Sequence, residues 1–226
     1  MIGRLLNKAR VAYHALSVRS FQDFERSSSG YITLQAACRE CRAELHHAHQ
    51  HYVTQVSSHE MAVSVELSAL LLALCRINRW TRLLDMGSGF SSYVFRRYAK
   101  ENPGVTVYSV DDDAKWLHRT KMYLNDQRLR LDNLMTLEEF RQHTTSGFNC
   151  VLHDLNLVDV RIQYVGEVLS RVAPGGLIVF DDVHKTEYVL PLMGKLSSQP
   201  GVTYSLKAAT IDQFGRYAFG FIGGFE

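Results

Sequence analysis

The 226-residue sequence predicts an α/β protein in which a doubly wound, mostly parallel sheet ends in an antiparallel C-terminal hairpin and follows an N-terminal helical extension. Three observations support this fold class. Residues 1–80 have helical periodicity, residues 81–226 alternate short apolar runs with helical segments, and the last two runs, 202–208 and 217–222, lie close enough to pair. We divide the chain into an extension, residues 1–56, and a second domain, residues 57–226.

The first 22 residues predict a basic amphipathic helix. They contain four cations and no acid, and their apolar side chains share one helical face. A lid, an oligomer contact, a membrane-surface helix and a transit segment all remain open as interpretations. Further along the chain, Ser57 and Glu60 have the spacing of a capping box. Leucines at helical spacing follow from Leu67 to Leu74, so we expect this helix to pack on the second domain.

Five apolar runs then predict strands at residues 82–86, 105–110, 133–137, 149–153 and 176–181. A helix-length segment separates each run from the next, as for Val165, Val168 and Leu169 on one face. Strands that alternate with helices form a parallel sheet. Ligands of such sheets bind beyond the carboxyl ends of the strands, so the residues found there are the candidates for function.

The glycine turn after the first run predicts a nucleotide-type cofactor site. Gly87 and Gly89 allow a tight turn before a helix, and Asp111 follows about 20 residues later at the end of the second strand, where it can bind ribose hydroxyls. Ser92 stands where dinucleotide sites have a third glycine. Asp85, directly before the turn, would repel a phosphate but suits a ligand that carries an ammonium and a sulfonium.

These residues resemble motif I of the class I S-adenosylmethionine-dependent methyltransferases. The resemblance covers roughly residues 57–226 and implies a Rossmann-like fold and S-adenosylmethionine as the cofactor. It places the cofactor on the residues of the glycine turn and of the second strand's end: Asp85, Gly87, Ser88, Gly89, Ser91, Asp111 and Asp112.

Three carboxylates follow the fourth and fifth strands. Asp154 ends one strand, and Asp181 and Asp182 end the next. Without compensation these carboxylates would repel one another, and Mg²⁺ with oxygen ligands would relieve the repulsion, so we take Asp154, Asp181 and Asp182 as candidate metal ligands. The placement resembles catechol-type and sugar O-methyltransferases.

The catechol-type enzymes also place a lysine base where this chain has Leu157. The candidates for the base are therefore Asp154, His184 and Asp182. His153 should face the opposite side of the sheet, because successive side chains on a strand alternate between faces.

The sequence thus predicts methyl transfer from S-adenosylmethionine to a small molecule, with an oxygen acceptor favoured and metal assistance left open. The alternatives are a metal-free N- or O-methyltransferase and a non-catalytic S-adenosylmethionine-binding protein. A net charge of +2 argues against a nucleic-acid partner. No apolar run approaches the ~18 residues of a membrane span. Four cysteines without a disulfide pattern favour a cytoplasmic location, and a homo-oligomer remains possible.

Overall fold

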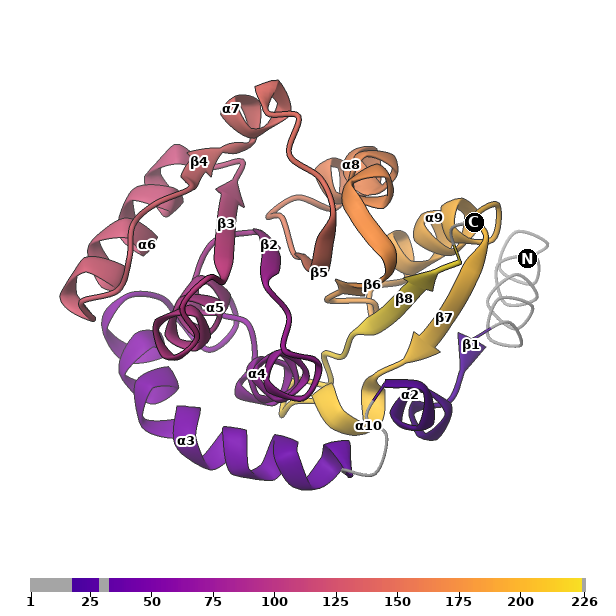
Figure 1. The fold of residues 1–226 in the computed structure, drawn as a ribbon, viewed down its shortest axis with the longest axis horizontal. Helices are drawn as coiled ribbons and strands as arrows, with labels where there is room; N and C mark the ends of the chain where they lie inside the picture. Colours follow the sequence, from indigo (N-terminus) through magenta and orange to yellow (C-terminus); the bar gives the residue numbers. More distant parts are fainter. Residues whose placement is uncertain (1–17, 29–32, 225–226) are drawn as a thin grey trace, which may run out of the picture.

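The computed structural model describes residues 18–28 and 33–224. Their strands form one sheet in the order β1-β7-β8-β6-β5-β2-β3-β4 (Figure 1). Strand β8 runs antiparallel to β6 and β7, and the other pairs are parallel. The fold class predicted from the sequence is confirmed. The strands are β1 (Val18–Arg19), β2 (Arg82–Met86), β3 (Thr106–Asp111), β4 (Leu134–Thr136), β5 (Phe148–His153), β6 (Val172–Phe180), β7 (Gly201–Ser205) and β8 (Phe219–Gly223).

Helices cover both faces of the sheet, because the apolar strands alternate their side chains between two cores. Leu83 belongs to the core beneath α2 to α6, whereas its neighbour Leu84 belongs to the core beneath α7 to α9. The same alternation along β5 and β6 makes three layers (Figure 1). The helices are α2 (Phe21–Ser28), α3 (Leu34–Gln55), α4 (Val65–Asn78), α5 (Phe90–Glu101), α6 (Ala114–Asp126), α7 (Leu137–Gln142), α8 (Val158–Arg171), α9 (Thr186–Leu196) and α10 (Lys207–Thr210).

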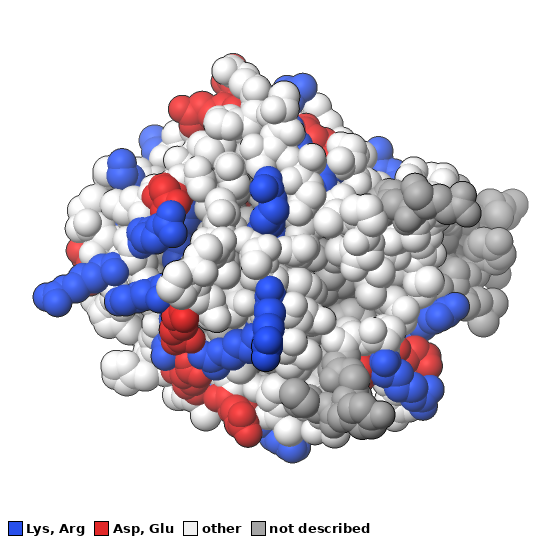
Figure 2. Space-filling model, viewed as in Figure 1, with Lys and Arg blue, Asp and Glu red and all other residues white. Residues whose placement is uncertain are grey.

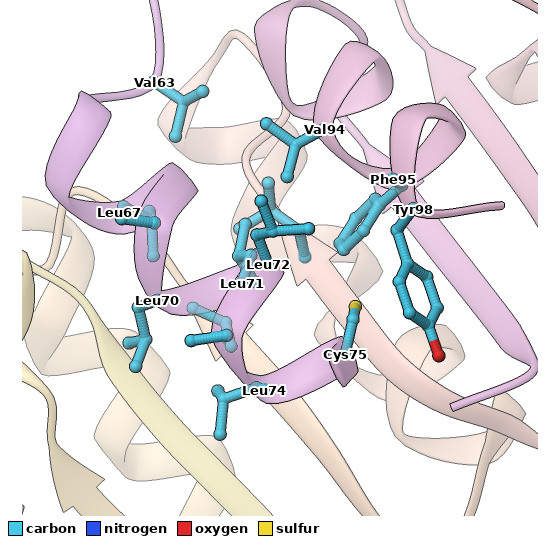
Figure 3. Close-up of a cluster of buried hydrophobic side chains, with 14 of the residues drawn as sticks. Val63, Leu67, Leu70, Leu71, Leu72, Leu74, Cys75, Val94, Phe95 and Tyr98 are labelled. Carbon is cyan, nitrogen blue, oxygen red and sulfur yellow. The ribbon is translucent and has the colours of Figure 1, made fainter. Parts of the chain in front are cut away.

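Helix α4 lies at the centre of the first core, where Leu67, Leu71 and Leu74 are almost completely buried (Figure 3). The expected packing of this helix is confirmed, but the expected capping box is wrong. The helix begins at Val65, and the Ser64 hydroxyl accepts a 3.1 Å hydrogen bond from the Leu67 amide. Residues 57–64 form turns instead of a helical start.

Arg216 explains this difference. Its guanidinium donates hydrogen bonds to the carbonyl oxygens of His59 and Glu60, at 2.9 and 2.6 Å. These carbonyl groups are therefore held by a residue 156 or 157 positions away, which the local sequence pattern does not include. The tertiary contact outweighs the local capping signal.

The described part of the expected extension packs closely on the second domain. Val18–Arg19 pairs with β7 as an edge strand. The expected basic helix therefore does not continue to residue 22. Its residues 1–17 lie outside the described part of the chain. Arg76 on α4 bonds both Glu44 of α3 and Glu101 of α5, at 2.7 and 3.0 Å. These ion pairs fix helix α3 to the helices that cover the sheet. The domain boundary expected at residue 56 stays a prediction.

Within residues 18–28 and 33–224, no helix is long and apolar enough to cross a membrane. The thiols of Cys38, Cys41, Cys75 and Cys150 are all free.

Candidate functional site

A cleft of about 230 Å³ opens at the carboxyl ends of β2, β3, β5 and β6. The end of helix α3 and residues 60–63 form its other wall, so this wall comes from residues that precede β2 in the sequence. The cleft is lined by Tyr52, Glu60, Met61, Ala62, Val63, Gly87, Ser88, Gly89, Phe90, Ser91, Asp111, Asp113, Trp116, Asp154, Asn156, Arg161, Asp181, Asp182, Lys185 and Arg216.

Gly87 brings two strand ends together at the floor of the cleft. Its φ of 112° lies in the left-handed region that favours glycine. A β-carbon at this position would overlap the carbonyl oxygen of Asp154, and the Asp154 amide donates a 2.6 Å hydrogen bond to Met86. The glycine turn therefore fixes the position of Asp154 as well as the loop itself.

Asp111 lines the cleft but is already hydrogen-bonded. Its Oδ2 accepts from the Ser88 amide at 2.8 Å and from the Ser88 hydroxyl at 2.7 Å, and its Oδ1 accepts from the Asp113 amide at 2.9 Å. An ionised carboxylate offers about four acceptor sites. About one therefore remains for a ribose hydroxyl, on the oxygen that Ser88 does not use. Burial raises the pKa of Asp111 to about 6 against the effect of these bonds.

Two of the proposed cofactor residues do not line the cleft. Asp85 is fully buried below the glycine turn, where its Oδ2 accepts from the hydroxyls of Ser92 and Ser109 at 2.5 and 3.3 Å. Burial raises the pKa of Asp85 to about 7. Asp112 is exposed and accepts a 3.3 Å bond from the Asn156 amide. Both side chains hold the loops around the cleft, so the expected contact between Asp85 and a ligand stays a prediction that this geometry does not support.

At the other end of the cleft, the three aspartates converge as expected, but Arg161 of α8 lies among them. Its Nη2 is 2.7 Å from Asp154 Oδ1, and its Nη1 is 3.3 Å from Asp182 Oδ2. The side chain of Arg161 is only 6% exposed, so these ion pairs are poorly screened by water. Lys185 adds a second cation, 2.6 Å from Asp182 Oδ2.

The carboxylates differ in protonation because their surroundings differ. Burial raises the pKa of Asp154 well above its usual range, and the opposing charge of Arg161 does not compensate for it. Burial raises the pKa of Asp181 to about 6. Burial also disfavours the charge on Asp182, but the bond from Lys185 and the charge of Arg161 outweigh it and hold that pKa below its usual value. One carboxylate is thus anchored as an anion while its neighbours titrate closer to neutrality.

The donor set does not fit the expected Mg²⁺ site. The expectation rested on an uncompensated repulsion, and Arg161 with Lys185 supplies the compensating charge. Among the described residues, no group of three or more His, Cys, Asp or Glu side chains has a geometry that could hold a metal ion. The assignment of Asp154, Asp181 and Asp182 as metal ligands stays a prediction, which the contacts of the Arg161 guanidinium with Asp154 and Asp182 do not support.

The two histidines lie outside the cleft. His184 Nδ1 is 3.7 Å from Asp182 Oδ1, too far for a hydrogen bond. His153 is fully buried on the opposite face of the sheet, with Nδ1 3.2 Å from the Tyr188 hydroxyl. Burial lowers the pKa of His153 to about 3, so its ring stays neutral. Leu157, at the place of the missing lysine, is exposed.

Several cleft residues were not identified in the sequence. Arg161 carried a usable signal, because it shares the buried face of α8 with Val165, Val168 and Leu169. A cation at a core position of an amphipathic helix needs a buried anionic partner. Lys185 follows Asp182 by three residues, so its place beside that carboxylate could have been predicted from the sequence. Tyr52, Trp116 and Arg216 carried no such signal, since they reach the cleft through tertiary packing.

Comparisons with known proteins agree with this architecture. Residues 84–183 match the family model described as a methyltransferase domain. No curated protein matches the sequence. The fold is similar to an O-methyltransferase from Bacillus cereus solved with S-adenosylhomocysteine, at a TM-score of 0.61 and 16% identity over 82% of this chain and 91% of that chain.

Two further solved structures share the fold. The O-methyltransferase TomG from Streptomyces achromogenes, involved in tomaymycin synthesis and solved with S-adenosylmethionine, has a TM-score of 0.59 and 16% identity over 100% of both chains. The tRNA (m1A58) methyltransferase TrmI from Aquifex aeolicus has a TM-score of 0.55 and 12% identity over 74% of this chain and 71% of that chain.

Proposed function

We propose that this chain, whose residues 84–183 match a methyltransferase domain, uses S-adenosylmethionine to methylate an oxygen of a small polar molecule without a metal ion. The observation that carries the proposal is the position of Arg161, which bridges Asp154 and Asp182 at the end of the cleft opposite Asp111. The glycine turn, Ser91 and Asp111 would hold S-adenosylmethionine, which supplies an already activated methyl group.

Asp154 is the residue that we assign as the base. It lines the cleft with its side chain 17% exposed, and burial raises its pKa well above the usual value, which makes the carboxylate a stronger base. The acceptor oxygen would form a bond to the methyl carbon as the carbon–sulfur bond breaks. The proton of that hydroxyl passes to the Asp154 carboxylate, which balances the charge lost from the sulfonium.

Arg161 is a positioning residue in this scheme. Its guanidinium fixes Asp154 Oδ1 at 2.7 Å, so the second oxygen of the carboxylate is the one available to a substrate. Its charge also keeps the pKa of Asp154 from rising further. Asp182, held as an anion by Lys185 and Arg161, can accept a hydrogen bond from a second hydroxyl of the acceptor.

The lining of the cleft supports a small, polar acceptor. Near the strand ends of β5 and β6 the side chains are carboxylates and cations, whereas the three aromatic lining residues surround the glycine turn: Tyr52, Phe90 and Trp116. Charged walls favour an acceptor with several hydroxyl groups over a planar aromatic one. On the face drawn in Figure 2, Lys and Arg are interspersed with Asp and Glu, in contrast to the continuous basic stripe that a nucleic acid favours.

The test is to incubate the purified protein with methyl-labelled S-adenosylmethionine and four acceptor classes: polyols and sugars, catechols, primary amines, and total RNA. Each reaction is run with excess EDTA and with added Mg²⁺. We expect label in the polyol or sugar class and equal rates in both conditions. Turnover that EDTA abolishes and Mg²⁺ restores would refute the metal-free mechanism. Label found only in RNA or amines would refute the acceptor class.

A further inference from the structure

The hydroxyl of Tyr52 is buried at the wall of the cleft without a hydrogen-bond partner. Tyr52 lies near the end of α3 and is only 1% exposed, and its oxygen makes no hydrogen bond of normal geometry in the described structure. The neighbouring Thr120 hydroxyl, which accepts a hydrogen bond from Ser88, interacts with the phenol too weakly to offset the effect of burial on its pKa. Its ring is held between two aromatic rings, with centroids 5.5 Å from Phe90 and 4.8 Å from Tyr123. A buried hydroxyl without a partner costs about 1 to 3 kcal/mol, so the position calls for an explanation.

The hydroxyl lies directly over the glycine turn. A β-carbon at Gly89 would lie 3.2 Å from the Tyr52 oxygen and 3.8 Å from Trp116 Nε1. Gly89 is the N-cap residue of α5, so the first amides of that helix start beside the hydroxyl. A helix start presents N–H donors and a partial positive charge, which together favour an anionic group. Any side chain at position 89 would narrow this space.

A donor role suits Tyr52 here. Burial raises the pKa of its phenol, so the hydroxyl keeps its proton near neutral pH and can donate it in a hydrogen bond. The neighbouring donor Trp116 is occupied, because its Nε1 donates a 2.6 Å bond to the Ser88 carbonyl oxygen. The carboxylate of Asp111 defines the ribose end of the cleft. The remaining anionic group of an S-adenosylmethionine bound across the glycine turn is its methionine carboxylate.

We infer that Tyr52 is a cofactor-binding residue that donates a hydrogen bond to the methionine carboxylate of S-adenosylmethionine. The inference rests on the proposed function and extends it, because it makes helix α3 part of the cofactor site. Residues 34–55 therefore complete the binding site of the domain that follows them in sequence.

The test compares Tyr52→Phe with the unmodified protein in titration calorimetry, using two ligands. S-Adenosylhomocysteine carries the amino acid portion, and 5′-methylthioadenosine lacks it. A hydrogen bond to a charged group contributes enough that its loss should weaken S-adenosylhomocysteine binding about tenfold or more. Binding of 5′-methylthioadenosine should change less than about twofold, since the variant keeps every contact to the nucleoside.

Tyr123→Phe is the matched control. Tyr123 is also buried, its hydroxyl also lacks a partner, and its ring contacts Tyr52, but it does not line the cleft. Both variants should melt at or above the temperature of the ligand-free protein, because each removes an unsatisfied hydroxyl. Only Tyr52→Phe should reduce the rise in melting temperature that S-adenosylhomocysteine produces.

Unchanged S-adenosylhomocysteine affinity in Tyr52→Phe would overturn the inference, and so would an equal loss for both ligands or the same loss in Tyr123→Phe. Failure of the unmodified protein to bind S-adenosylhomocysteine would instead refute the proposed function, and calorimetry of that protein separates the two cases.

Discussion

Replacing Arg161 by Met should destabilise the protein in a pH-dependent way. The substitution keeps an unbranched apolar side chain but removes the charge that compensates Asp154 and Asp182. A pair of unit charges about 4 Å apart is worth about 4 kcal/mol at an effective dielectric constant of 20. Removal of one partner from a buried ion pair typically costs about 3 to 5 kcal/mol. We therefore expect Arg161→Met to lower the free energy of unfolding by about 3 to 5 kcal/mol at pH 8.

The loss should be smaller at pH 5. Arg161 lowers the pKa of Asp154, so without it the folded-state pKa rises further above the unfolded value. A carboxyl whose folded pKa is raised contributes stability below its unfolded pKa and loses it as pH rises through the folded pKa. The variant can thus relieve the unpaired charge by protonation more fully at pH 5 than at pH 8. Urea unfolding followed by circular dichroism at both pH values measures the difference.

The double variant Arg161→Met/Asp154→Asn should recover part of the lost stability at pH 8, because the unpaired charge is gone. Arg171→Met is the matched control on the same helix. Arg171 is also largely buried, with Nη2 2.8 Å from Glu167, but it lies away from the cleft. The stability lost in Arg171→Met should not be recovered when Asp154→Asn is added. Equal losses for Arg161→Met at pH 5 and 8, or no recovery in the double variant, would refute the electrostatic role of Arg161.

Four further substitutions test the remaining assignments. Asp154→Asn should reduce turnover at least about 100-fold and leave S-adenosylhomocysteine affinity within about threefold in calorimetry; normal turnover would remove Asp154 as the base. Asp111→Asn should weaken S-adenosylhomocysteine about tenfold at pH 8. The difference in affinity between this variant and the unmodified protein should shrink below pH 6, where the Asp111 carboxyl of the unmodified protein becomes protonated. Asp85→Asn should reduce the fall in unfolding free energy between pH 5 and 8 by about 2 to 3 kcal/mol, because Asp85 must lose its proton with a folded pKa of about 7. An unchanged pH slope would contradict this. Gly87→Ala should yield a protein with a much lower melting temperature or none in soluble form, since its β-carbon meets the Asp154 backbone; a normal melting temperature would show that the turn can move.

Much of the fold could be predicted because its signals are local. Apolar runs with a helix-length gap between them specify a parallel sheet, and the positions of the runs match β2 to β6 within a few residues. Two local signals failed: the basic helix expected to residue 22 does not continue through strand β1, and the capping box at Ser57 was overridden by hydrogen bonds from Arg216. The sequence could not show the contact with Arg216, since the two segments lie more than 150 residues apart along the chain.

The site divides in the same way. The glycine turn and the acids at the strand ends were visible in the sequence, because a parallel sheet brings the carboxyl ends of its strands to one edge. Their electrostatic state was decided by Arg161, which reaches the edge from the next helix and compensates the charges that seemed to require a metal. Likewise, Tyr52 enters the cleft only because α3 packs over the start of α5. The sequence by itself determined which chemical groups stand at the edge of the sheet, since local patterns specify the strands and the residues that end them. Only the tertiary structure decided which of them are paired, buried or left with an unsatisfied bond, because those properties depend on neighbours distant along the chain.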